Sequence, residues 1–350
     1  MRIALVSTSA VAVPPKAYGG TEAVVAALAR GLTRRGHAVT VFATGDSLPE
    51  SALRSIHARP VWPPSEEAER EHVTFSWQCI ERDADFDVVH LHNGAALAAA
   101  PTMDRTGPAI VYTMHDERRE DLVALYRRYD RFVSFVAISH RQAELLPDLR
   151  VRAVIRHGID PSAFAMGTGR GGYCAFLGRF AREKGAHVAI DAAVRACVPL
   201  RIGAPAPNAH IAAHCEYFDV EIRPRLARHR ACVWLGELDH EAKVDLVANA
   251  CALLFPIDWE EPFGLVMIES MMCGTPVIAF GRGSVPEVVI PGATGHIVST
   301  SNDLAQTLRT IHRCDRTQCR ERAIEKFNDG RMVDAYERLY AHVAAEQRST

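Results

Sequence analysis

Residues 252 to 280 of the chain read ALLFPIDWEEPFGLVMIESMMCGTPVIAF. The apolar run Ala252–Phe255 stops at a proline, an acidic loop follows, and Gly264–Met272 has the pattern of a short helix that Gly274 ends. A second apolar run, Pro276–Phe280, completes a predicted strand–helix–strand unit. In such a unit the loop and the first helical amides lie at the carboxyl end of the sheet, where anions bind.

Two glutamates in this stretch indicate a ligand that carries hydroxyls as well as phosphates. Glu261 lies in the loop and Glu269 about a turn and a half into the helix, so both can face a ligand that rests on the first helical amides. A carboxylate beside a phosphate would repel it, so we expect both to accept hydrogen bonds from hydroxyls. This combination predicts a nucleotide sugar. The substrate-binding candidates of this stretch are Phe263, Gly264, Leu265, Val266 and Glu269.

The same residues resemble a known family. Glu-Pro-Phe-Gly-Leu-Val-x-x-Glu over 261–269, followed by Cys-Gly-Thr-Pro-Val over 273–277, is similar to the Glu-x7-Glu signature of the retaining glycosyltransferases of family 4. The resemblance implies an α/β fold called GT-B, in which two Rossmann-like, doubly wound parallel-sheet domains face a central cleft. The alternative is an ordinary α/β crossover with two solvent-facing glutamates.

The length agrees with two domains, because 350 residues exceed what a single hydrophobic core usually holds. With the resemblance, we expect an N-terminal Rossmann-like acceptor-side domain over residues 1–156 and a C-terminal nucleotide-sugar-binding domain over residues 157–330. The apolar spacing after residue 331 predicts a last helix. In GT-B folds such a helix, here residues 331–350, crosses back to the first domain.

Composition excludes several classes of protein. The 40 basic and 42 acidic residues nearly balance, so no global charge attracts nucleic acid or acidic lipid. The nine cysteines are scattered mostly singly, as expected in a reducing cytosol, and predict no disulfide framework. Met1-Arg2 leads directly into an apolar strand, which leaves no room for a signal peptide, and no apolar run is long enough to span a membrane. We therefore expect a cytoplasmic protein, with peripheral membrane contact left open.

Two features of the N-terminal half are candidates for donor contacts. Gly19 and Gly20 begin a helix after the first strand, where bare amides can hold an anion, although glycines there could equally serve a tight turn. His115 follows the strand Ala109–Thr113 at its carboxyl end. Family 4 enzymes have a histidine near the donor sugar at this place, and a half-buried structural ring is an equal alternative.

A third motif supplies positive charge. Arg179 and Lys184 stand in a Gly-Arg-x-x-x-x-Lys-Gly frame that the family shares, and a guanidinium and an ammonium there suit a diphosphate gripped from two sides. Two fixed cations can do the task of a metal, so we expect neither a metal ion nor a cofactor. Glu237, after the strand that contains Trp234, is expected to border the nucleobase.

Three other patterns are set aside. Gly167–Gly172 satisfies Gly-x-Gly-x-x-Gly, but it precedes a strand and opens no helix, so a dinucleotide site is rejected. Asp83–Asp87 holds two Asp-x-Asp triplets before a strand and is interpreted as a solvated turn. Cys314 and Cys319 have no partner pair at zinc-finger spacing, which argues against a metal site.

The resulting hypothesis is a retaining glycosyltransferase that moves a sugar from a nucleoside diphosphate sugar to an acceptor hydroxyl. UDP is expected ahead of GDP because it is the commoner donor nucleotide in the family. The acceptor stays open between a saccharide, a lipid-linked molecule and a small molecule. Alternatives are a nucleotide-sugar epimerase and a non-catalytic sugar-nucleotide binding protein. The catalytic candidates are Glu261, His115, Arg179 and Lys184.

Overall fold

The computed structural model describes residues 1–83, 85–98 and 107–349. The chain forms two compact units, unit 1 of Met1–Gly158 with Asp329–Thr350 and unit 2 of Ile159–Asn328. The division lies two residues from each predicted domain boundary. Unit 2 closes on itself, because the Ile159 amide donates to the Phe327 carbonyl at 2.9 Å and Ile159 forms a bridge with Asn328.

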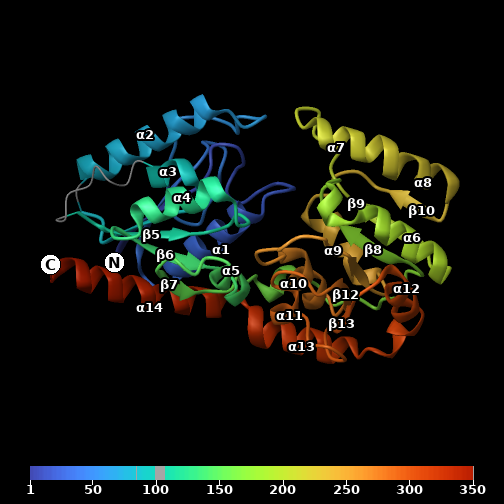
Figure 1. Ribbon diagram of the computed structural model, residues 1–350. Coiled ribbons are helices and arrows are strands. Elements are labelled where there is room, and N and C mark those ends of the chain that lie inside the picture. The colour runs from blue at the N-terminus through green and yellow to red at the C-terminus, as the bar shows by residue number, and fades with distance from the viewer. Residues whose placement is uncertain (84, 99–106, 350) are drawn as a thin grey trace. The chain divides into compact units, whose positions relative to one another are not determined.

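Unit 1 is a seven-stranded parallel sheet in the order β3-β2-β1-β4-β5-β6-β7 with helices around it (Figure 1). Its strands are β1 (Arg2–Val6), β2 (Ala38–Phe42), β3 (Ala52–Arg54), β4 (Val88–Leu91), β5 (Ala109–Thr113), β6 (Val133–Ala137) and β7 (Val151–Val154). Its helices are α1 (Gly20–Arg34), α2 (Glu66–Asp83), α3 (Gly94–Ala98), α4 (Glu120–Tyr129), α5 (His140–Glu144) and α14 (Asp329–Arg348).

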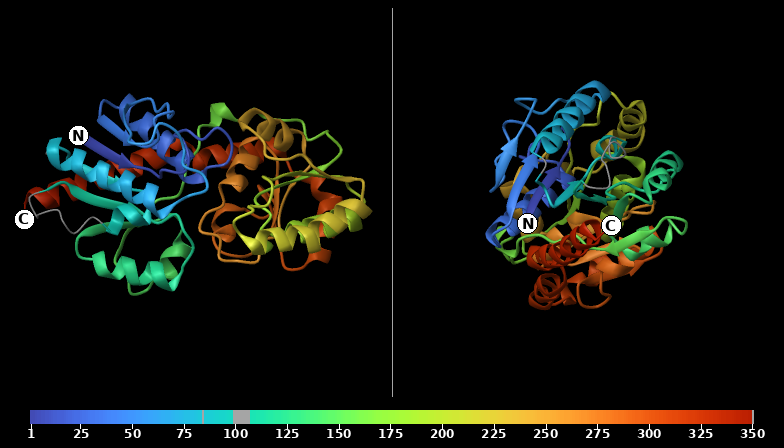
Figure 2. Two further views of the ribbon diagram at one scale, coloured as in Figure 1. Left: turned by 90° about the horizontal axis from the view of Figure 1, so that it is seen from above. Right: turned by 90° about the vertical axis from the view of Figure 1, so that its left-hand side faces the viewer.

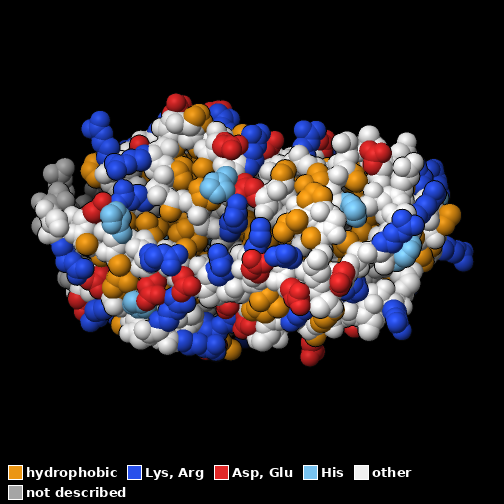
Figure 3. Space-filling view, turned by 90° about the horizontal axis from the view of Figure 1, so that it is seen from below, with side chains coloured by type: hydrophobic (Ala, Val, Ile, Leu, Met, Phe, Trp, Pro, Cys, Tyr) orange, Lys and Arg blue, Asp and Glu red, His pale blue; other side chains and the backbone are white. Residues whose placement is uncertain are grey.

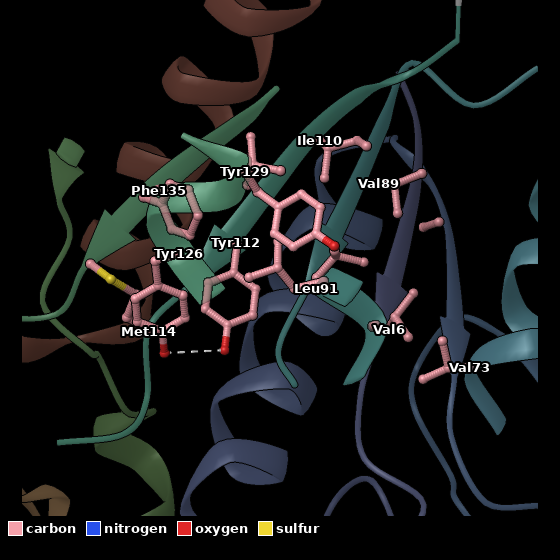
Figure 4. Packing of buried hydrophobic residues seen from close by; sticks show 14 of the residues in the cluster. Val6, Val73, Val89, Leu91, Ile110, Tyr112, Met114, Tyr126, Tyr129 and Phe135 are labelled. Carbon is pink, nitrogen blue, oxygen red and sulfur yellow. Dashed lines mark hydrogen bonds between the residues drawn. The ribbon is translucent and has the colours of Figure 1, made fainter. Parts of the chain in front are cut away.

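The core of unit 1 follows from its strand composition. Every residue of β4 and β5 is buried, as expected of parallel strands covered on both faces. Figure 4 shows one side of this core, where Tyr112 of β5 packs with Tyr126 and Tyr129 of α4 and with Phe135 of β6. Burial of several aromatic rings contributes much of the hydrophobic stabilisation of this unit.

Unit 2 is a six-stranded parallel sheet in the order β10-β9-β8-β11-β12-β13. Its strands are β8 (Cys174–Leu177), β9 (Leu200–Gly203), β10 (Cys232–Trp234), β11 (Leu253–Phe255), β12 (Val277–Phe280) and β13 (Gly295–Val298). Its helices are α6 (Ala186–Ala196), α7 (Ala212–Tyr217), α8 (Arg223–Arg228), α9 (His240–Asn249), α10 (Leu265–Met272), α11 (Val285–Val288), α12 (Ser301–Thr310) and α13 (Arg316–Phe327).

Both sheets are doubly wound, and this places the loops that carry the candidate residues. In each sheet the strand order reverses beside the first strand of the unit, which is β1 next to β4 in unit 1 and β8 next to β11 in unit 2. Loops that leave the carboxyl ends of these two strands diverge and make the crevice in which ligands of such sheets bind. The predicted GT-B class of α/β fold, with two parallel-sheet domains, is confirmed.

The last helix belongs to unit 1 although it follows unit 2 in the chain. Helix α14 contacts α1 and β5, and both views in Figure 2 keep this red helix against the sheet of unit 1. Tyr336 and Tyr340 of α14 are fully buried there. Their hydroxyls are hydrogen-bonded to Thr113 Oγ1 at 2.7 Å and His90 Nδ1 at 2.6 Å, so the helix is joined to the sheet by polar as well as apolar contacts.

The patterns that were set aside have structural roles. Asp83 ends α2 and pairs with Arg54 at 2.6 Å, and Asp85 pairs with Arg2 at 2.6 Å, at the amino end of β4. The Gly167 amide donates to the Cys273 carbonyl at 3.1 Å, so the glycine-rich segment lies against the backbone of unit 2. The nine cysteines are all free thiols. On the face drawn in Figure 3, basic and acidic side chains are interspersed.

Candidate active site

In unit 2 the loops after β8 and β11 meet. A short 3-10 turn, Arg182–Lys184, precedes α6, and the Asp258 amide donates to the Glu183 carbonyl at 2.8 Å. Because β8 and β11 are neighbours at the reversal point of the sheet, these loops leave the same edge side by side. The Gly-Arg-x-x-x-x-Lys-Gly frame and the acidic loop are therefore parts of one site.

Lys184 and Glu261 form an ion pair in this site. Lys184 Nζ lies 2.7 Å from Glu261 Oε2, and the two side chains are 16% and 10% exposed. The indole Nε1 of Trp259 donates to the same oxygen at 3.0 Å, and Lys184 Nζ lies 4.1 Å from the centre of the Trp259 ring. The ammonium is thus held by a carboxylate and by the face of an aromatic ring.

Helix α10 begins next to this ion pair. Gly264 is its N-cap with φ 80°, a left-handed conformation that side chains with a Cβ rarely adopt. A Cβ at this position would lie 2.7 Å from Met267 Cε, the flexible end of that side chain, so the positive φ is the stronger requirement for glycine. Phe263 is buried, whereas Gly264, Leu265 and Val266 are half-buried. The first amides of α10 have no acceptor within the helix and can serve an anion there.

The segment after β12 holds the acidic loop that contains Glu261 in place by hydrogen bonds. The Ser284 amide donates to the Glu261 carbonyl at 2.9 Å, and the buried Ser284 hydroxyl donates to the Phe263 carbonyl at 2.7 Å. Gly283 has φ 54°, and a Cβ there would lie 2.3 Å from the backbone nitrogen and oxygen of Glu261. Only glycine allows this approach, so the position of Glu261 depends on it.

Glu269 of α10 makes a second ion pair, with a lysine of α9. Lys243 Nζ of α9 lies 2.6 Å from Glu269 Oε1, and the two side chains are 23% and 12% exposed. The sequence interpretation assigned no role to Lys243 or to Trp259. Trp259 lies only two residues before Glu261 in the sequence. This short spacing could have indicated that its indole N–H reaches the Glu261 carboxylate. Lys243 carried no comparable local signal.

The remaining predicted residues of unit 2 lie on the loops at the same edge of the sheet. Arg179 follows β8, and its Nε is buried without a hydrogen-bond partner among the described residues. A guanidinium N–H in that state has capacity for an anionic ligand. Glu237 is exposed in the loop between β10 and α9.

In unit 1 the predicted glycines lie after the loop that follows β1. Gly19 is the N-cap of α1 and Gly20 its first residue. The buried carboxyl of Glu22, in the first turn, accepts a hydrogen bond from the Thr8 hydroxyl at 2.6 Å. Burial raises the pKa of Glu22, and the Thr8 hydrogen bond partly opposes this. Glu22 therefore joins the start of α1 to the end of β1.

His115 lies just beyond the carboxyl end of β5, next to two other histidines. Its Nε2 is 2.9 Å from Nδ1 of His92, which follows β4, and its ring stacks on His157 with centres 5.3 Å apart. Gln142 of α5 donates to the carbonyls of Met114 and Asp116 and so holds the backbone on both sides of His115. Burial lowers the pKa of His115 to about 4, so its ring is neutral at pH 7.

Two further observations concern possible metal ligands and cavities. No group of three or more His, Cys, Asp or Glu side chains in the described part of the chain could hold a metal ion. A hollow of about 770 Å³ in unit 2 is lined by Arg182, His187, Asp258 and Arg282 among others, but by none of the predicted site residues. Lys184 and Glu261 lie beside the start of α10, whereas Gly19, Gly20 and His115 lie in unit 1.

Comparison with known proteins identifies the family. The family described as "Glycosyltransferase Family 4" matches residues 18–163, and "Glycosyl transferases group 1" matches residues 169–326. The two matches follow one another along nearly the whole chain. The chain belongs to glycosyltransferase family 4. The resemblance predicted from the Glu-x7-Glu motif is thereby confirmed, and this glycosyltransferase carries that motif at Glu261 and Glu269.

Individual relatives agree with the assignment. A phosphatidyl-myo-inositol mannosyltransferase of Mycobacterium tuberculosis is 28% identical over 324 residues, which cover 85% of this chain and 82% of the relative. Among solved structures, sucrose-phosphate synthase of Thermosynechococcus elongatus matches with TM-score 0.83, 20% identity and coverage of 99% and 100%. Anabaena HepE, solved in complex with UDP and glucose, matches with TM-score 0.76, 19% identity and coverage of 97% and 99%. The two solved structures establish the fold of this glycosyltransferase.

Within the described residues, no helix of this glycosyltransferase combines the length and the apolar character that crossing a bilayer requires.

Proposed function

We propose that this glycosyltransferase transfers a sugar from a nucleoside diphosphate donor to an acceptor hydroxyl with retention of the anomeric configuration. The observation that carries the proposal is the joining of Lys184, Trp259 and Glu261 at the reversal point of the unit 2 sheet, beside the first amides of α10. A cation, a carboxylate and bare helix amides at one place suit a ligand that presents phosphates next to sugar hydroxyls.

The proposed reaction breaks the bond between the anomeric carbon and a phosphate oxygen, and the electron pair stays on the diphosphate. The acceptor oxygen forms the new bond to the same face of the anomeric carbon, and its proton goes to the departing phosphate. Arg179, Lys184, the Gly20 amide and the amides of Gly264 and Leu265 would stabilise the negative charge that grows on the leaving group. With this much fixed positive charge we propose that the reaction needs no metal ion and no cofactor.

The carboxylates are assigned to hydroxyls. Glu261 would bind hydroxyls of the donor sugar and stabilise positive charge on its ring, and Glu269 would bind the ribose. In unit 1, His115 would contact the donor sugar, and Gly19 would keep the chain close to the diphosphate. Glu237 would border the nucleobase. Lys243 would hold the Glu269 carboxylate in position, because it already pairs with Oε1 at 2.6 Å.

We propose UDP as the donor nucleotide ahead of GDP and the cytoplasm as the location. Support for UDP comes from its frequency in the family and from Anabaena HepE, which has been solved in complex with UDP and glucose and with UDP-glucose. A thermal-shift screen with UDP, GDP and ADP, each alone and as its sugar, tests the choice, because a ligand that binds only the folded state raises the melting temperature. A shift with GDP compounds alone would contradict the UDP assignment.

Glu269→Ala should weaken the binding of the nucleoside diphosphate by about 10- to 100-fold, since one or two hydrogen bonds to a charged carboxylate are lost. Isothermal titration calorimetry measures the affinity directly. The matched control is Glu241→Ala, which removes an exposed carboxylate from α9 in the same unit. An unchanged affinity in Glu269→Ala would refute the ribose assignment.

A further inference from the structure

His92 has a geometry that the proposed reaction leaves unused. It follows β4 directly, its ring is 3% exposed, and its Nδ1 lies 2.9 Å from Nε2 of His115. On its other side the ring lies 4.0 Å, centre to centre, from that of His90. His90 is itself fixed, because its two nitrogens lie 2.6 Å from the Tyr340 hydroxyl and 2.7 Å from Thr113 Oγ1. His92 is thus held between an immobile ring and His115.

We infer that His92 is a positioning residue that fixes the tautomer and orientation of His115. Burial lowers the pKa of both rings well below 6.5, so each is neutral at pH 7 and carries one N–H. One proton then serves the hydrogen bond between His92 Nδ1 and His115 Nε2. If His92 donates, both rings are protonated on Nδ1, and if His115 donates, both are protonated on Nε2. The tautomers of the two rings are therefore coupled.

The other nitrogen of His92 selects between these two states. Its Nε2 is buried and has no hydrogen-bond partner among the described residues. In the second state this atom would be a buried N–H without an acceptor, and orphaned N–H groups of that kind are rare in folded proteins. In the first state the atom is a bare lone pair. His92 therefore donates from Nδ1, and His115 carries its own proton on Nδ1, leaving an N–H to offer to a ligand oxygen.

The consequence for the reaction rests on the proposed contact between His115 and the donor sugar. If the ring turned over, a carbon-bound hydrogen would replace the nitrogen, and if it changed tautomer, a lone pair would stand where a sugar hydroxyl oxygen needs a donor. His92 prevents both changes without touching the substrate itself. The effect of losing His92 should appear in the use of the donor, with the fold of unit 1 retained.

The first test is the state of the rings and does not depend on activity. In the full-length protein with ¹⁵N-labelled histidine, long-range ¹H–¹⁵N spectra at pH 7 distinguish the two tautomers of each ring. We expect His92 and His115 both as Nδ1–H forms, and His115 as a mixture of forms in His92→Phe, whose ring has no nitrogen. An Nε2–H form of His115 in the wild type, or an unchanged His115 in His92→Phe, would overturn the inference.

The second test is kinetic. His92→Phe should lower kcat/KM for the donor by about tenfold, and His92→Asn, whose amide can replace Nδ1, should restore it to within about threefold. The control is Tyr129→Phe, which removes a hydrogen bond to the Ala98 carbonyl elsewhere in unit 1 and should leave kcat/KM unchanged. Equal losses in His92→Asn and His92→Phe would show a structural role only. If no nucleotide sugar binds the wild type, the proposed function fails, and the spectra still decide the tautomers.

Discussion

Lys184→Ala is expected to lower kcat by about 10²- to 10³-fold, the effect usually found when one preorganised group that stabilises developing negative charge is removed. The ammonium lies 2.7 Å from Glu261 and near the first amides of α10, so the substitution removes positive charge at the proposed leaving group. Initial rates at saturating donor measure the change. Because the variant also leaves the nearly buried Glu261 carboxylate without its cation, its urea unfolding must be measured in parallel.

The matched comparison for this prediction is Lys243→Ala. Lys243 also forms a partly buried pair with a glutamate of the same motif, at 2.6 Å, but it holds the residue assigned to the ribose. Its loss should raise KM for the donor and change kcat by less than about threefold. A folded Lys184→Ala variant with near-normal kcat, or equal losses of kcat in the two variants, would contradict the leaving-group role of Lys184.

Acid is expected to destabilise unit 1 through its buried histidines. His90, His92 and His157 are 0%, 3% and 4% exposed, and burial lowers the pKa of each well below 6.5. In the unfolded chain the same rings titrate near pH 6.5. As the pH falls below that value the unfolded state binds more protons than the folded one, so stability is lost. At pH 5.5 each ring lowers the free energy of unfolding by about 1.4 kcal/mol relative to neutral pH, so the three together lower it by up to about 4 kcal/mol.

Two carboxyls of unit 1 oppose this loss, because desolvation raises the pKa of Glu22 and of Asp116. The folded state takes up their protons first and gains stability as the pH falls. Urea unfolding of the full chain at pH 7.5 and 5.5, followed by hydrogen exchange in peptides of β4 and β5, measures the net change. His157→Asn should remove the contribution of one ring, about 1.4 kcal/mol, and His342→Asn, an exposed position on α14, should remove none. Equal unfolding free energies at the two pH values would contradict the destabilisation of unit 1 by its buried histidines.

The fold was largely predictable because its strands are apolar runs between strong turn signals. The strand predicted at Ala109–Thr113 has these bounds in the structure, and the runs Ala252–Phe255 and Pro276–Phe280 form strands that begin one residue later. Strand β3 was missed, because Ala52–Arg54 is only three residues long, lies at the edge of its sheet and alternates little. Strand β13, Gly295–Val298, was not predicted either; it is an edge strand whose single pairing is with β12.

The candidate site was predictable where chemistry is local in sequence. Glu261, Glu269 and the glycine between them stand in one loop and helix, and their spacing alone suggested a shared ligand. Contacts between distant segments were not predictable. Lys243 reaches Glu269 from another helix, and His92 reaches His115 only because their strands are neighbours in the sheet. Such contacts depend on strand order, which no local pattern contains.

The paired ends of unit 2 have an evolutionary consequence. Ile159 and Asn328, the first and last residues of unit 2, form a bridge with one another. The chain therefore enters and leaves this unit, which carries the Glu-x7-Glu motif, at neighbouring points. In genetic terms unit 2 is encoded by one continuous stretch whose two ends lie side by side in the protein, a geometry that suits exchange as a cassette. Recombination between family members at these points would replace unit 2 as a whole and leave the chain of unit 1 unchanged.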